Sequence, residues 1–255
     1  FAISGTSKNQ LAKARRTARH YVIRELPQEL TTILTETGIS GFTVIPETTK
    51  ERNGTITELR ADTHPSVIYV NYNSVIPETS EYVKPRVKIE ISSLSMDEPV
   101  ETRTLRSFIS EAVPDAEDME IRFKTVIPTR TFLEKIFLLH EEFQKKNPRS
   151  YRMSRHLYDI ERIMDTSFGN EALKDLKLYD EIIAHRNIFN HIDGVDYSSH
   201  NHDRINFIPP TELMDDWKND YKSLEEHFLY SSATHLSFDQ LLERMHELLR
   251  RIRQM

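Results

Sequence analysis

The sequence predicts an α+β protein in which a mixed sheet with its helices comes first and an all-helical domain second. Stretches with the two-residue alternation of β-strands all precede Pro128. After Pro128, apolar residues recur with the 3.6-residue period of helices. We therefore expect two domains, at residues 1–127 and 128–255.

The composition is typical of a soluble globular protein, with 38% hydrophobic and 29% charged residues among 255. No apolar run approaches the roughly 18 residues of a membrane span, and no signal-peptide pattern opens the chain. The chain has no cysteine, which excludes disulfides and thiolate metal sites. We expect a cytoplasmic protein with no membrane partner.

The first elements combine a strand end with a long helical pattern. Residues 1–4 resemble the end of a strand, and a helical pattern follows over residues 8–37. Pro27 is expected to kink or split this helix, because proline removes a helical hydrogen bond, and Gly38 to end it.

Strand signals then follow one another up to Pro128. Asn53-Gly54 is a hairpin-turn dipeptide, so the segments on either side of it are expected to form strands. The predicted strands cover residues 42–46, 55–61, 66–72, 86–92 and 119–126.

Five helices are expected in the second half, at residues 129–146, 154–166, 171–190, 210–228 and 237–254. The last is strongly amphipathic. Its apolar face consists of Phe238, Leu241, Leu242, Met245, Leu248, Leu249 and Ile252.

One helix face in this half carries a charged cluster. At 100° per residue, Arg152, Arg155, His156 and Asp159 fall within an arc about 100° wide, opposite an apolar arc. Two fixed cations, an imidazole and a carboxylate on one face could hold a polyphosphate together with a metal or a proton. The alternative is a solvated face with an Arg155–Asp159 ion pair at i,i+4.

The preceding helix contributes a second set of candidates. Lys135 and Glu134 lie off an apolar arc that contains Phe132 and Ile136. His140 lies inside that arc, which is more typical of a hydrogen-bonded core histidine than of a metal ligand.

Glu90 is a carboxylate at the centre of a short, apolar-flanked strand. Two-metal nucleotidyl-transfer sites place hard oxygen ligands for Mg²⁺ in this way. A solvent-facing strand glutamate has the same pattern, so that alternative stays open.

The first helical pattern, residues 8–24, is basic although the net charge of the chain is −6. It could bind a nucleic acid, or it could be a solvated helix face.

Several motifs together resemble the AbiEii/AbiGii family of nucleotidyl-transferase toxins. The main pair is Arg130-Thr-Phe-x-Glu-Lys-x-x-x-Leu-His140 followed by Arg152-x-Ser-Arg-His-x-Tyr-Asp159. The likeness extends over nearly the whole chain, through Val87-Lys-Ile-Glu-Ile91, Phe207-Ile-Pro-Pro210, Asp220-Tyr221 and the helix that opens with Ser237-Phe-Asp.

This resemblance implies a nucleotidyltransferase-like first domain and a helical second one. It also implies the toxin half of a bacterial toxin–antitoxin pair that limits phage spread, with a cognate antitoxin as partner. Such toxins transfer a nucleotidyl group from an NTP to an RNA such as the tRNA acceptor end, with Mg²⁺ as cofactor. The alternative is a non-catalytic interaction or nucleic-acid-binding module.

Residue by residue, the resemblance makes Glu90 a metal ligand, Lys135 the residue that neutralises the NTP phosphates and Asp159 the polar anchor of the last motif. Arg152, Arg155 and His156 would be its nucleotide-binding neighbours. The family's Gly-Gly/Ser turn and Asp-x-Asp pair are absent from the 255 residues. In the family, residues like Phe1-Ala-Ile-Ser4 directly follow that pair, so we expect a truncated domain that does not catalyse by itself.

Overall fold

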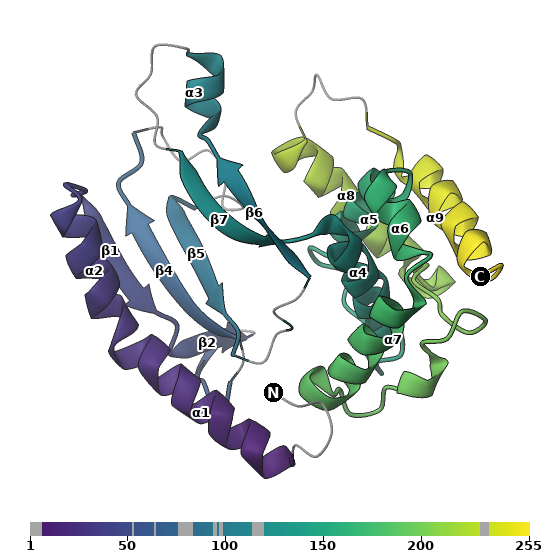
Figure 1. The fold of residues 1–255 in the computed structure, drawn as a ribbon, viewed down its shortest axis with the longest axis horizontal. Coiled ribbons are helices and arrows are strands. Elements are labelled where there is room, and N and C mark those ends of the chain that lie inside the picture. The colour runs from purple at the N-terminus through teal and green to yellow at the C-terminus, as the bar shows by residue number, and fades with distance from the viewer. Residues whose placement is uncertain are drawn as a thin grey trace. The chain divides into compact units, whose positions relative to one another are not determined.

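The computed structural model describes residues 7–52, 54–63, 65–75, 84–93, 96, 99–113, 120–229 and 235–255. The chain divides into two compact units, Phe1–Ser95 and Met96–Met255. Seven strands precede six of the α-helices within these described ranges, which confirms the α+β class (Figure 1). The functional division at residues 127/128 stays a prediction.

The first unit opens with two helices, α1 (Lys8–Arg24) and α2 (Leu26–Glu36). The Ser7 hydroxyl accepts from the Gln10 amide, and the Gln10 side chain accepts in return from the Ser7 amide. This reciprocal capping box starts α1. Pro27 lies in the first turn of α2, where its missing N–H costs nothing, so the predicted split is confirmed.

Two small sheets follow in this unit. One has the order β1-β4-β5 and the other pairs β2 with β3. All of these pairs are antiparallel, so the expected mixed sheet is wrong for the described strands. The bounds are β1 Phe42–Pro46, β2 Thr49–Arg52, β3 Thr55–Glu58, β4 Ser66–Tyr72 and β5 Arg86–Ile91.

The hairpin at Gly54 differs from the expected one. Gly54 has φ +75°, as a tight turn requires. The strand before the turn is β2, which the sequence analysis missed, whereas residues 42–46 pair with β4. The predicted strand at residues 1–4 lies outside the described residues.

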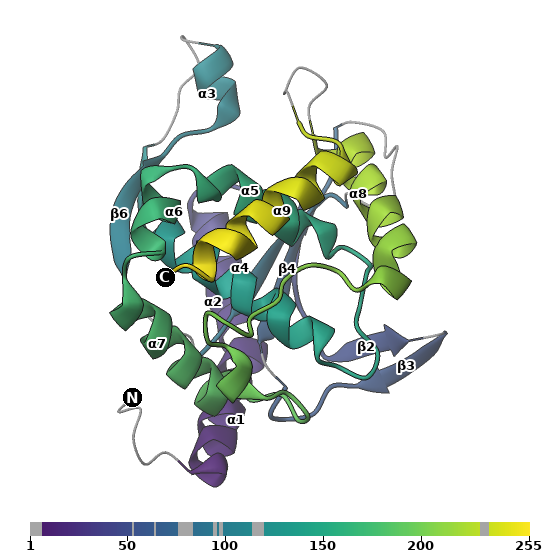
Figure 2. The same cartoon turned by 90° about the vertical axis from the view of Figure 1, so that its right-hand side faces the viewer.

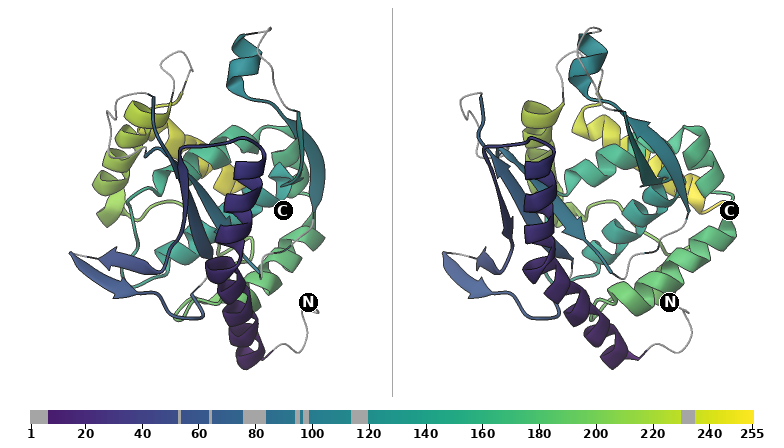
Figure 3. Two further views of the ribbon diagram at one scale, coloured as in Figure 1. Left: turned by 90° about the vertical axis from the view of Figure 1, so that its left-hand side faces the viewer. Right: turned by 60° about the vertical axis from the view of Figure 1, so that its left-hand side comes forward.

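Helices α1 and α2 pack on the three-stranded sheet, with α2 against β1 and α1 against β4 (Figure 3). Leu11 and Val22 of α1, and Val67 and Ile68 of β4, are among the buried apolar residues of this unit. This packing fixes the side of α1 that faces the strands.

The second unit begins with an antiparallel hairpin of β6 (Val100–Leu105) and β7 (Ile121–Val126). Only β7 was predicted. The two strands are mostly exposed, so β6 lacks the buried alternation that sequence patterns reveal. A short helix, α3 (Phe108–Ala112), follows β6.

Helices make up the rest of this unit. Where one helix was predicted at residues 171–190, the chain forms α6, α7 and a π-helical turn, because Asp175 caps a new helix there. The bounds are α4 Pro128–Phe143, α5 Ser154–Met164, α6 Ser167–Ala172, α7 Leu176–His185, the π-turn Arg186–Asn190, α8 Met214–Phe228 and α9 Phe238–Ile252.

The core of this unit forms around α4 and α5. Helix α4 contacts α5, α6 and α7, while α5 also contacts α8 and α9. Figure 2 shows α9 crossing over this group. The largest fully buried side chains of this core include Trp217, Tyr221, Phe132 and Phe137. The core holds the polar faces of α4 and α5 next to each other.

Candidate functional site

Lys135 of α4 and Asp159 of α5 form an ion pair with 2.7 Å between Nζ and Oδ2. The Lys135 ammonium also lies 3.5 Å from His156 Nδ1. An ammonium can only donate, so Nδ1 accepts and the imidazole carries its proton on Nε2. Three of the predicted site residues therefore meet where α4 and α5 pack.

The field around His156 is positive. Burial, together with the cations Lys135, Arg155 and Arg149, lowers the pKa of His156 to about 3. The imidazole is thus neutral at physiological pH, because protonation would add a charge to a cationic and partly dehydrated place. Arg155 is exposed, which leaves its guanidinium accessible to an anion.

A buried carboxylate anchors Arg149 beside this cluster. Glu142 of α4 is 1% exposed and accepts from Arg149 Nε at 3.0 Å and Nη2 at 2.7 Å. Lys145 adds a bond of 2.6 Å. Although burial opposes it, these donors lower the pKa of Glu142 to about 2. Sequence reasoning missed this clamp, because a glutamate beside the apolar arc looks solvated.

Asp220 of α8 fixes the start of α5. Its carboxylate accepts from the backbone amides of residues 152–154 and from the Ser154 hydroxyl, which is 2.6 Å away. Arg152 has φ 58°, the left-handed region, and this turns consecutive amides toward one anion. The cap determines where the face with His156 and Asp159 points.

A buried charge network lies farther along α4. Arg186 in the π-turn donates to both oxygens of Glu141, with 2.7 Å from Nε, and to Glu134 at 2.6 Å. Arg186 and Glu141 are 6% and 1% exposed. Arg186 is the first residue of the π-helical turn that follows α7, and its bonds to Glu134 and Glu141 hold it against α4. The network links the polar side of α4 to the turn after α7.

His140 is a core histidine, as predicted. It is buried and bonded to the Ser199 hydroxyl at 2.8 Å and to Asn206. Burial and the neighbouring His200 lower the pKa of His140 to about 4.

Glu90 lies on β5 of the other compact unit and pairs with Lys88, with 2.5 Å between Nζ and Oε1. Its side chain is 53% exposed. Within the described ranges, no group of three His, Asp or Glu side chains could hold a metal ion. A single carboxylate already paired with a lysine does not fit a metal site, so the role of Glu90 stays a prediction.

The structure thus brings Lys135, His156 and Asp159 together and adds Arg149 to them. Within the described residues, Asp159 forms its ion pair with Lys135. The alternative of an Arg155–Asp159 pair at i,i+4 is therefore not what the structure contains. Arg152 contributes its backbone to the Asp220 cap, and the nucleotide role of its side chain stays a prediction. The roles of the other predicted residues are not tested by geometry alone.

Two comparisons with known proteins add to this geometry. A family model described as nucleotidyl transferase AbiEii toxin of a type IV toxin–antitoxin system matches residues 10–244. None of the curated proteins compared with the chain matches it. No helix in the described part of the chain is long and apolar enough to cross a membrane.

Proposed function

The chain belongs to the AbiEii family of nucleotidyl transferase toxins of type IV toxin–antitoxin systems, and we propose that its Lys135–Asp159 face binds the NTP triphosphate. The observation that carries this proposal is the Lys135–Asp159 ion pair with neutral His156 beside it. A toxin of this class acts in a pair with an antitoxin and uses an NTP as substrate.

Each side chain has a part in the proposal. Lys135 and Arg155 offset the phosphate charge that develops during transfer. Asp159 keeps the Lys135 ammonium in place, since a carboxylate next to a cation is better suited to orient it than to take a proton. His156 offers its Nε2–H as a neutral donor that adds no repulsion toward the arginines.

The finer parts of the activity are also proposals. We expect an RNA acceptor, with the tRNA acceptor end as the first candidate, and dependence on Mg²⁺. Both come from the resemblance of the motifs. The described residues supply no metal site, so no step here involves the ion. The 255 residues lack the Gly-rich turn and the Asp-x-Asp pair of the family.

The test is transfer of labelled nucleotide to total RNA by the gene product, with and without Mg²⁺, combined with its toxicity in cells. Lys135→Ala should reduce transfer about a hundredfold or more, because a positioned charge in a transition state has that effect. Asp159→Asn keeps the size and one acceptor, so we expect a smaller loss of about tenfold.

Lys218 and Asp239 provide a matched control, since they form an exposed lysine–aspartate pair at 3.1 Å in the same unit. Lys218→Ala and Asp239→Asn should leave transfer unchanged. All four variants should unfold within about 1 kcal/mol of the parent. Full transfer and toxicity with Lys135→Ala, or its global unfolding, would show that Lys135 has only a structural role.

A further inference from the structure

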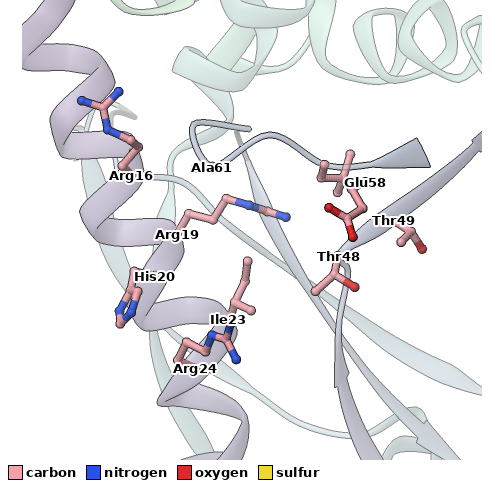
Figure 4. Close-up of a pocket in the computed structure, with 10 residues that line it drawn as sticks. Arg16, Arg19, His20, Ile23, Arg24, Thr48, Thr49, Glu58 and Ala61 are labelled. Carbon is pink, nitrogen blue, oxygen red and sulfur yellow. The ribbon is translucent and has the colours of Figure 1, made fainter.

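A pocket of about 460 Å³ lies in the first unit, between α1 and the residues around β2 and β3 (Figure 4). Pockets that bind small ligands have volumes of this order. Its walls carry Arg19 and Arg24 on one side and Thr48, Thr49 and Glu58 on the other. None of these residues belongs to the Lys135 cluster, which lies in the second unit.

Arg19 is the unusual residue of this pocket. It is 3% exposed, and its Nη2 donates to the Glu47 carbonyl at 3.0 Å. Its Nη1 is buried and has no hydrogen-bond partner within the part of the chain that the structure describes. A buried donor without an acceptor is costly, and more so on a charged group. The Arg19 side chain extends toward Glu58 and Thr48 in Figure 4.

The other polar groups define what the ligand must offer. Arg24 is exposed and forms no ion pair within the described residues, so it provides a second cation on the same wall. Figure 4 shows Arg16 and His20 pointing away from Glu58, so they add little to this side. Glu58 and the hydroxyls of Thr48 and Thr49 lie opposite the arginines.

A bare anion does not suit both walls, because Glu58 would repel it. A ligand with an anionic end and a hydroxyl-bearing end suits both. Its anion would accept from Arg19 Nη1 and Arg24, while its hydroxyls would donate to Glu58. Arginine forks match phosphate oxygens in geometry.

We propose that this pocket binds a ribose phosphate, with the phosphate at Arg19 and Arg24 and the ribose hydroxyls at Glu58. A free ribonucleotide and a nucleotide within an RNA strand present the same group, and the experiment separates them. The proposal does not depend on the role of Lys135. The residues that line this pocket and the residues of the Lys135 cluster are different and belong to different units.

The test is titration of the whole chain with AMP, deoxy-AMP, a short single-stranded RNA and the DNA of the same sequence. Arg24→Ala and Arg19→Lys should each weaken binding of AMP or RNA about tenfold, as loss of a charge-assisted bond does. Lys13→Ala removes an exposed cation from the same helix outside the pocket, so binding should be unchanged. Glu58→Gln should reduce the preference for ribose over deoxyribose.

RNA binding much more tightly than AMP would identify a strand as the ligand, and equal affinity would identify a free nucleotide. Because Arg19 is buried, its variant could unfold. The Nε–H resonance of Arg19 in the parent chain should then shift on addition of AMP or RNA. Absence of binding, equal loss with Lys13→Ala, or equal affinity for ribose and deoxyribose ligands would overturn the proposal.

Discussion

At the scale of single residues, two buried or half-buried histidines are expected to make the stability of the fold depend on pH. Burial lowers the pKa of His156 to about 3 and that of His140 to about 4, with nearby cations and His200 as the next causes. An unfolded histidine titrates near 6.5. Between those values the unfolded state binds more protons, so stability is present above about pH 6.5 and is lost as the pH falls.

We therefore predict that the free energy of unfolding decreases between about pH 6.5 and about pH 4, by at most about 1.4 kcal/mol per pH unit for each histidine. Urea titrations across this range measure it. His140→Gln should flatten the slope, whereas His246→Gln, at an exposed site on α9, should leave it unchanged. An identical slope in all three proteins would show that neither the burial nor the charges act as described.

Some contacts of the candidate site could be predicted from the sequence and others could not. The arc with Arg155, His156 and Asp159 was visible from spacing, because all three lie on one helix. Spacing left the partner of Asp159 open between Arg155 and Lys135, because Lys135 is on another helix and only packing decides which faces meet. The buried clamp of Glu142 on Arg149 was missed for a different reason, because a glutamate beside the apolar arc of α4 looks solvated in the sequence.

At the scale of elements, the cap of α5 by Asp220 is the contact with the clearest consequence. Asp220→Ala would leave three amides and the Ser154 hydroxyl without their acceptor. We predict a loss of about 1–3 kcal/mol in the free energy of unfolding, because unsatisfied groups retain their desolvation cost. Chemical denaturation measures this directly.

The control for this prediction is Asp239→Ala, which removes an exposed carboxylate that forms an ion pair with Lys218. Its cost should be at most about 1 kcal/mol. If the two alanine variants lose equal stability, the cap does not stabilise α5 beyond an ordinary surface charge.

Amphipathic helices were the elements that the sequence predicted best. The apolar face of α9 gave its position within a residue or two at each end. The β6 strand was missed because Val100-Glu-Thr-Arg-Thr-Leu105 has no buried alternation. The break between α6 and α7 was missed because the cap at Asp175 depends on a local turn within an otherwise helical pattern.

At the scale of the whole molecule, the buried apolar side chains of the described residues are divided unequally between the two units. The large apolar cluster contains only residues of the second unit, from Phe132 to Ile252. The first unit buries far fewer apolar side chains, among them Leu11, Val22 and Ile68. The α+β class was predictable because strand and helix periods separate along the chain. Sheet pairing was not, because it depends on long-range contacts.

We predict from this distribution that residues 96–255 fold without the first unit. Their apolar cluster closes within the unit, so removing residues 1–95 leaves every member of it in place. The fragment should unfold cooperatively, and Leu248→Ala within it should cost about 2–5 kcal/mol, as truncation of a fully buried leucine does. Circular dichroism during thermal and urea unfolding measures both. Arg250→Ala, at an exposed position on the same helix, should cost no more than about 0.5 kcal/mol. A fragment without a cooperative transition, or one in which both substitutions have the same effect, would show that the core needs the first unit to form.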